Sequence, residues 1–253
     1  MSIELAIPTV LPDGMDLQGY ALMGLLVMAG ACMQGVGGIG FSMLSAPIAV
    51  LAYAAMVPGP LLLLGGLVSV MAALRDRGAI QWRIATDCIL GRTFGAALAT
   101  AVMVAFSARL LATAFGLLLL GGAVLSATGW RIVPNRRNAW IAGIFSGLMG
   151  TITSAGAPPL GLLTQQLAPT AIRATIGCII AIGSVISLVM LAAAGQFSMQ
   201  QLVLGLALFP WVTAGFAISN RISRHVSAAL MRRVLLMLVT ASALMILARA
   251  WIG

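Results

Sequence analysis

The chain has 253 residues, of which 61% are hydrophobic and 8% are charged, and its mean hydropathy is +1.11. A soluble domain usually has about 25% charged residues, so this chain lacks the polar side chains that would cover a soluble core. Its fourteen basic residues are all arginine, and they face five acidic residues and one histidine. The composition excludes a soluble globular enzyme and indicates an all-α polytopic membrane protein.

The net charge of +9 does not indicate nucleic-acid binding, because the arginines lie between long apolar runs instead of clustering on one polar face. Cys32, Cys88 and Cys178 lie inside apolar segments and lack the spacing of paired metal ligands. The sequence therefore predicts no metal, no cofactor and no nucleic-acid partner. The lipid bilayer is the expected environment.

Ten helical segments are predicted from the stretches without charged residues, divided where glycine, proline or polar runs interrupt them. A spanning helix needs about 20 residues, and several of these segments are shorter. For 41–56 and 158–168 the sequence leaves open whether they span the membrane or re-enter it from one side. In chain order the ten segments are 17–35, 41–56, 60–74, 84–106, 109–128, 139–155, 158–168, 170–194, 201–219 and 228–250.

Arginine placement predicts the orientation, because the cytoplasmic loops of membrane proteins are enriched in basic residues. Ten of the fourteen arginines lie in the loops 75–83, 131–137 and 221–233, which are therefore placed in the cytoplasm. The N-terminal tail, residues 1–16, contains acidic side chains and is placed on the opposite, extracytoplasmic side. The predicted location is the inner (plasma) membrane.

The two halves of the chain share a pattern that indicates an internal repeat. Residues 30–38 and 143–150 are each rich in small residues and are each followed by a glycine-rich break and then a proline. Loop 75–83 carries three arginines whereas loop 195–200 carries none, so the second half is expected to be inverted, as in secondary transporters. Coincidental packing of small residues is the alternative.

The expected organisation is a first transmembrane repeat at 17–130, a cytoplasmic linker at 131–138 and a second repeat at 139–253, with about five helical segments in each repeat.

Residues 143–160, which read GIFSGLMGTITSAGAPPL, resemble the hallmark segment of the sulfite exporter TauE/SafE family. Residues 35–47 resemble its first-half copy, residues 173–175 a second-half helix start, and residues 81–83 the loop before the fourth segment. One departure is that residues 154–157 read Ser-Ala-Gly-Ala where the family often has consecutive glycines. The resemblance covers about residues 20–250, and it implies export of small sulfur-containing anions such as sulfite or organosulfonates.

The two helix breaks, at 35–40 and 154–159, are the predicted binding site. Backbone that is not helical inside a membrane must line a cavity or be covered by protein, and the N–H groups at helix starts attract anions. The breaks are therefore expected to be buried, to face each other near the membrane midplane and to suit a tetrahedral oxyanion. Hydrogen bonding between helices is the alternative role of the polar side chains. The candidate substrate-binding residues at the breaks are Gln34, Gly37, Gly38, Ser42, Ser154, Gly156 and Gln165.

Arg92 and Arg173 are the candidate cationic residues of the site. A charge inside a membrane is costly and marks a functional site by default, so Arg92 is a candidate contact of the anion. A structural pair with Asp87, or extension of the side chain to the cytoplasmic interface, is the alternative. Arg173 follows the start of a helix, where it could meet an exiting anion or serve only as a basic anchor.

The scarcity of acidic residues near the membrane interior bears on how transport is driven. Ion-coupled carriers usually use a buried carboxylate, and Asp87 is the only acid near the membrane interior. An anion leaving a cell with a negative interior gains about 2.3 kcal/mol per charge per 100 mV. The sequence therefore predicts an anion exporter that works by alternating access, driven by the anion gradient and the membrane potential. The alternatives are an importer, a proton-coupled carrier of another small organic anion such as a carboxylate, and a non-transporting membrane subunit. An enzyme is not expected, and exposed small-residue faces permit a homodimer.

Overall fold

The computed structural model describes residues 15–128, 132–222 and 228–252, and this part of the chain contains helices and no strand. Each of the ten predicted segments corresponds to one α-helix, so the predicted all-α fold is confirmed. Short 3-10 helices, Ala54–Met56 and Arg77–Ala79, follow the second and third of them. In chain order the α-helices are α1 (Leu17–Gly37), α2 (Phe41–Ala52), α3 (Gly59–Arg75), α4 (Trp82–Ala105), α5 (Ala108–Thr128), α6 (Arg136–Thr153), α7 (Ala157–Thr164), α8 (Pro169–Ala193), α9 (Met199–Ile222) and α10 (Ala228–Ile252).

Helix α6 begins earlier than the sequence predicts. Its first residue, Arg136, falls inside the segment 131–138 that was expected to be a linker. The cause is Asn135, whose side-chain oxygen accepts a hydrogen bond from the Asn138 N–H at 2.8 Å and so caps the helix. The linker between the fifth and sixth helices is correspondingly shorter.

Helices α2 and α7 are too short to cross a membrane. At a rise of 1.5 Å per residue, the twelve residues of α2 and the eight of α7 cover about 18 and 12 Å, against a hydrocarbon core of about 30 Å. α2 runs back along α1, because the Ser45 hydroxyl lies beside Gly30 and the Tyr53 hydroxyl beside Gly19. By contrast α1, α4, α5, α8 and α9 are long and apolar enough to cross.

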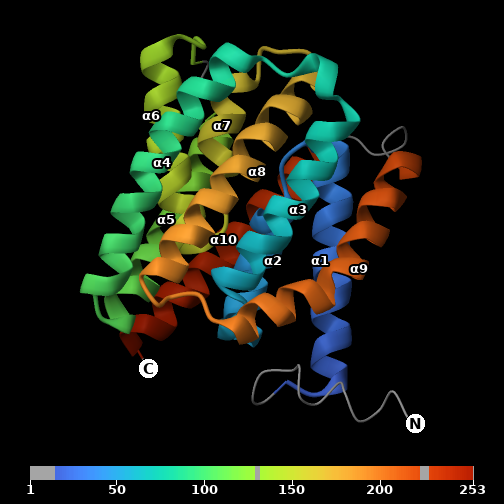
Figure 1. Cartoon of the computed structure of the whole chain (residues 1–253). Helices are drawn as coiled ribbons and strands as arrows, with labels where there is room; N and C mark the ends of the chain where they lie inside the picture. Colours follow the sequence, from blue (N-terminus) through green and yellow to red (C-terminus); the bar gives the residue numbers. More distant parts are fainter. Residues whose placement is uncertain (1–14, 129–131, 223–227, 253) are drawn as a thin grey trace.

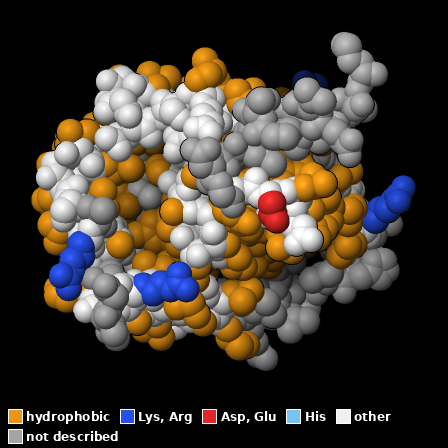
Figure 2. Space-filling model, turned by 90° about the horizontal axis from the view of Figure 1, so that it is seen from below, with side chains coloured by type: hydrophobic (Ala, Val, Ile, Leu, Met, Phe, Trp, Pro, Cys, Tyr) orange, Lys and Arg blue, Asp and Glu red, His pale blue; other side chains and the backbone are white. Residues whose placement is uncertain are grey.

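Large apolar side chains point outward from the long helices, as contact with lipid requires. Leu22 of α1, Phe94 of α4 and Val189 of α8 are between 60% and 63% exposed. Figure 2 views the molecule from the end where α1 begins, and it shows many hydrophobic side chains and few charged ones. The exposed surface is therefore that of a multi-pass membrane protein.

The described parts of the three arginine-rich connections lie at one end of the bundle, at the upper edge of Figure 1. An ion pair of 3.5 Å between Arg136 and Asp87 joins the start of α6 to the first turns of α4. A hydrogen bond of 2.8 Å from Arg75 Nη1 to Asn220 Oδ1 joins the end of α3 to the end of α9. α1 begins and α10 ends at the opposite end. This arrangement fits the orientation predicted from arginine placement, whereas residues 1–14 of the tail, residue 131 and residues 223–227 lie outside the described residues.

Helix packing relates the two halves of the chain. Helices α1–α5 correspond in order to α6–α10. The contact of α1 with α9 then corresponds to that of α6 with α4, and the contact of α3 with α9 to that of α8 with α4. The contact of α2 with α10 corresponds to that of α7 with α5. The pairs α3–α8 and α5–α10 are each formed by corresponding helices. Exchanging α1–α5 with α6–α10 therefore leaves these neighbours unchanged, as a two-fold repeat requires. Inversion of the second half across the membrane stays a prediction.

Candidate functional site

The two helix breaks each begin with a residue in the left-handed conformation. Gly38, the residue after α1, is in the left-handed region with φ 78°, and Gly40, with φ 135°, precedes α2. Ser154, the residue after α6, is the one non-glycine residue with a positive φ (59°) among the described residues, and Gly156, with φ −84°, precedes α7. The left-handed conformation suits glycine and disfavours a side chain. Ser154 is held there by its hydroxyl, which donates to the Pro58 carbonyl oxygen at 2.9 Å.

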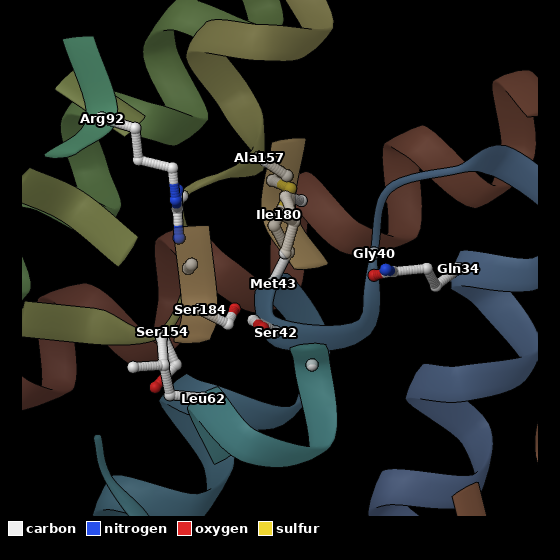
Figure 3. Close-up of a pocket in the computed structure, with 13 residues that line it drawn as sticks. Gln34, Gly40, Ser42, Met43, Leu62, Arg92, Ser154, Ala157, Ile180 and Ser184 are labelled. Atoms are coloured by element: carbon white, nitrogen blue, oxygen red, sulfur yellow. The ribbon is translucent and has the colours of Figure 1, made fainter. Parts of the chain in front are cut away.

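Both breaks line one pocket in the interior of the bundle (Figure 3). The starts of α2 and α7 both border it, so the positive ends of two helix dipoles favour an anion there. The residues that line the pocket come from α1, α2, α3, α4, α7, α8 and the two breaks. They are Gln34, Gly40, Ser42, Met43, Leu62, Gly65, Arg92, Ser154, Ala155, Gly156, Ala157, Ile180 and Ser184. The predicted site residues among them are Gln34, Ser42, Arg92, Ser154 and Gly156.

Arg92 extends from α4 to this pocket and is fully buried, with 1% of its surface exposed. Its Nη1 donates to the Ser146 carbonyl oxygen at 2.9 Å and to the Ser146 hydroxyl at 2.6 Å. That hydroxyl in turn donates to the Gly156 carbonyl oxygen at 2.6 Å. These bonds fix the guanidinium against the second break, while its Nε has no hydrogen-bond partner within the described residues.

Three glycines leave the room that the Arg92 guanidinium occupies. A Cβ on Gly183 of α8 would overlap Arg92 Nε, and a Cβ on Gly150 would lie 2.8 Å from Nη2. A Cβ on Gly156 would lie 2.7 Å from Nη1. Because protein interiors are close-packed, none of these positions accepts alanine unless Arg92 moves. The glycines therefore position a charged side chain as well as packing helices together.

Arg92 has no ionic partner in the part of the chain that the structure describes. Asp87, five residues earlier, pairs with Arg136 at 3.5 Å, and Asp76 pairs with Arg173 at 3.0 Å. The structure thus contradicts both alternatives for Arg92, the pair with Asp87 and the extension to the interface. A buried charge is costly unless a partner compensates it, so this position suits the binding of an anion.

Gln34 lines the pocket but is bonded within the first break. Its Nε2 donates to the Ser69 hydroxyl at 2.7 Å, and that hydroxyl donates to the Gly65 carbonyl oxygen at 2.6 Å. Its Oε1 accepts a long hydrogen bond of 3.4 Å from the Phe41 N–H. These bonds join α1, α2 and α3, so Gln34 holds the first break in shape from the edge of the pocket.

Arg173 lies at the arginine-rich end of the bundle and does not line the pocket. Its Nε pairs with Asp76, and its aliphatic stem packs on Gly38, where a Cβ would lie 2.9 Å from Arg173 Cγ. Arg75 lies in the same group, with Nη2 donating to the Gly35 carbonyl oxygen at 2.6 Å. Arg173 therefore joins the ends of α1, α3 and α8. The predicted site residues that do not line the pocket are Gly37, Gly38, Gln165 and Arg173.

Ser146, Gly183 and Ser184 belong to the site and were not predicted. Each is a small residue in an apolar helix, which is also the signal given by residues that only pack helices together. Ser187, one turn after Ser184 in α8, bonds to the Thr151 hydroxyl at 2.8 Å and does not line the pocket. The sequence does not separate the two serines, because the distinction depends on which face of α8 meets α4.

The pocket offers hydrogen-bond donors and positive charge for a small ligand. Its polar side chains include the Arg92 guanidinium and the hydroxyls of Ser42, Ser154 and Ser184, beside apolar residues such as Ile180. Figure 3 shows Arg92 and Gln34 on opposite sides of the pocket, with Ser184 and Ser42 between them. Among the residues that the structure describes, no three His, Cys, Asp or Glu side chains come together as metal ligands.

Comparisons with known proteins agree with this architecture. A family model described as sulfite exporter TauE/SafE matches residues 22–246. The "Probable inner membrane transporter protein TsaS" of Comamonas testosteroni is 27% identical over 184 residues, which cover 68% of this chain and 74% of that protein. No solved structure matches.

A multi-pass bundle with a buried pocket between two broken helices has the architecture of a membrane transporter. The chain belongs to the sulfite exporter TauE/SafE family, which its sequence resembles, and it is an inner membrane protein. The family and the relative are transporters, which agrees with the prediction that the chain is not an enzyme.

Proposed function

We propose that the protein exports small sulfur-containing anions, such as sulfite or organosulfonates, by alternating access. The observation that carries this proposal is the Arg92 guanidinium, which is buried at the pocket shared by the two breaks and has no carboxylate partner within the described residues. The description of the family, which names sulfite export, supports a sulfur oxyanion as the ligand.

A sulfur oxyanion would balance the charge that the fold leaves uncompensated. Hydrogen bonds between a guanidinium and an anionic oxygen are about twice as strong as neutral ones. Nη1 of Arg92 is bonded to Ser146, so the edge formed by Nε and Nη2 is the one that can receive two oxygens of the ligand. Ser42, near the start of α2, can donate a further hydrogen bond to the ligand, whereas the Ser154 hydroxyl already donates to the Pro58 carbonyl oxygen.

The driving force does not require a coupling ion. Asp87, the acid nearest the membrane interior, is bonded to Arg136, and the pocket lining contains no carboxylate. A monovalent anion gains about 2.3 kcal/mol per 100 mV on leaving a negative interior. Export down the electrical gradient therefore follows from the charge of the substrate.

The packing suggests which helices move. α1, α3 and α9 contact one another, as do α4, α6 and α8, and the two groups meet where α3 packs against α8. Ser42 and Gln34 line the pocket from the first side, and Arg92, Ser154 and Ser184 line it from the second. Movement of one group against the other would open the pocket alternately to each side of the membrane.

The test is efflux from liposomes that contain the purified full-length protein and isotopically labelled sulfite. Potentials are clamped with a potassium gradient and valinomycin, and methanesulfonate and acetate are loaded in parallel. We expect sulfite or methanesulfonate efflux above protein-free liposomes, faster when the interior is negative. Efflux that is indifferent to voltage but steep in pH contradicts uniport, and efflux of acetate alone contradicts a sulfur-anion exporter.

A further inference from the structure

Two buried donors at the pocket have no hydrogen-bond partner within the described residues. They are Arg92 Nε and the Ser184 hydroxyl, and Ser184 is 2% exposed. Both residues line the same pocket although they come from different helices, α4 and α8. Ser45 also has an unpartnered buried hydroxyl, but that hydroxyl lies between α1 and α2 beside Gly30 and Ser45 does not line the pocket. The coincidence of two such donors at one pocket therefore concerns Arg92 and Ser184 only.

The packing brings Arg92 Nε next to the backbone that carries Ser184. Arg92 Nε lies directly against Gly183, the residue before Ser184, where a Cβ would overlap it. Ser184 is supported from the other side by Gly66 of α3, where a Cβ would lie 3.0 Å from Ser184 Cβ and 3.5 Å from its hydroxyl oxygen. Both donors are thus held by close packing and have little freedom to find partners elsewhere.

Leaving a buried donor unsatisfied is costly, and native proteins leave few of them. A ligand with two acceptor oxygens on one atom can accept from both donors at once. Sulfite, sulfonates and carboxylates have this chemistry. Because the guanidinium is charged, such a ligand would be an anion.

We propose that Ser184 binds the transported anion together with Arg92, its hydroxyl and the Arg92 Nε–H each donating to one oxygen. This inference rests on the proposed function, in which Arg92 balances the charge of that anion. It adds a specific neutral donor to the site, on the helix that packs against α4. It also gives Gly183 a role, because any larger residue there would displace Nε.

Ser187 provides a matched control on the same helix. It is 0% exposed, lies one turn after Ser184 and is bonded to the Thr151 hydroxyl at 2.8 Å. Removing the Ser187 hydroxyl breaks a hydrogen bond of the folded protein, whereas removing the Ser184 hydroxyl removes an unpartnered group. We therefore expect Ser184→Ala to weaken binding without lowering stability, and Ser187→Ala to lower stability without weakening binding.

The experiment measures the Kd of sulfite and of methanesulfonate by isothermal titration calorimetry, and the ligand-free Tm, on the full-length protein in detergent. For Ser184→Ala we expect a Kd about tenfold to a hundredfold higher, the loss of one hydrogen bond to a charged ligand, with an unchanged or higher Tm. For Ser187→Ala we expect a lower Tm and a Kd within about twofold of the wild type. The inference is overturned if Ser184→Ala keeps the wild-type Kd, or if both variants weaken binding equally.

Failure of this inference and failure of the proposed function have different signatures. If the wild type binds sulfite and Ser184→Ala binds it equally well, only the role of Ser184 is lost. If Arg92→Gln binds sulfite as the wild type does, the proposed role of Arg92 fails, and with it the joint site. If the wild type binds neither sulfite nor methanesulfonate, both proposals are overturned.

Discussion

In the first break, at Gly38 and Gly40, the side chain that faces the pocket from the preceding helix is the neutral amide of Gln34. In the second break Ser154 corresponds to Gly38. Gln34 lies four residues before Gly38, whereas the residue four before Ser154 is a glycine, Gly150. The space beside that glycine is filled by Arg92, which comes from another helix. Two breaks that each begin with a left-handed residue thus present an amide on one side of the pocket and a cation on the other.

The helices that pack on the two breaks differ in the same way. Gly95 of α4 and Gly215 of α9 mark equivalent crossings, because a Cβ at either position would meet a backbone carbonyl oxygen of α6 or α1 respectively. Three residues before each glycine stand Arg92 and Val212, both buried. Only one of the two crossings therefore carries charge. The comparison teaches that a repeated backbone can supply the pocket while a few side chains on one side supply its chemistry.

The largest expected effect comes from removing the cation from the second break. Arg92→Met keeps an unbranched stem about as far as Nε and loses the guanidinium with its charge. We expect sulfite efflux to fall at least about a hundredfold, because the group that balances the anion is gone. We also expect stability to rise by about 1–4 kcal/mol, because a buried unpaired charge is removed. Liposome efflux and thermal unfolding in detergent measure the two effects.

The matched control for this variant is Arg83→Met, at the exposed start of the same helix. We expect that substitution to leave efflux close to the wild-type rate. If Arg92→Met were less stable than the wild type yet still exported sulfite, Arg92 would be a structural residue and the contrast between the breaks would lose its functional meaning.

A second test adds a side chain at one left-handed position and removes the side chain at the other. Gly38→Ala forces a side chain into a backbone with φ 78° and against Arg173, where its Cβ would lie 3.0 Å from Arg173 Cα. We expect a loss of about 1–2 kcal/mol or more. Ser154→Gly relieves the same strain but loses the bond to Pro58, so its net effect should stay within about 1 kcal/mol. Thermal unfolding measures both variants. If Ser154→Gly lost as much stability as Gly38→Ala, the left-handed conformation would not strain the side chain of Ser154 as it strains one at position 38.

The network of the first break offers a smaller effect. Gln34→Met should lower stability by about 1 kcal/mol, because it removes the bond to Ser69 between α1 and α3. A double-mutant cycle with Ser69→Ala isolates this pair, and we expect a coupling energy of about 0.6–1.7 kcal/mol. Strictly additive losses would mean that Gln34 does not hold the first break through Ser69.

The smallest effect concerns the contact between Arg173 and Asp76 at the arginine-rich end. This ion pair is partly exposed, with side-chain exposures of 20% and 17%, so Asp76→Asn should cost at most about 1 kcal/mol. The difference in Tm from the wild type should shrink in high salt, because exposed charges are screened. A difference that does not change with salt would point to packing on Gly38 instead of electrostatics.

Part of the site could be predicted from the sequence because its signals are local. The glycine and proline interruptions of apolar runs identified both breaks, and an arginine within an apolar segment identified Arg92. The partner of Asp87 could not be predicted, because Arg136 is 49 residues away in the chain (136 − 87) and meets Asp87 only when α6 packs on α4. Gln165 and Arg173 do not line the pocket, which α8 reaches only further along, at Ile180 and Ser184.

The sequence by itself determined the membrane environment, the ten helices and the places where two of them break, because apolar run length and the backbone preferences of glycine and proline act over a few residues. The scarcity of acids and the abundance of arginine also indicated an anion as the substrate. Only the tertiary structure decided that Arg92 is without a carboxylate among the described residues, that glycines of two other helices make room for it, and that Ser184 rather than Ser187 reaches the same pocket. These features depend on which helix faces meet, which is settled by packing between segments far apart in the chain.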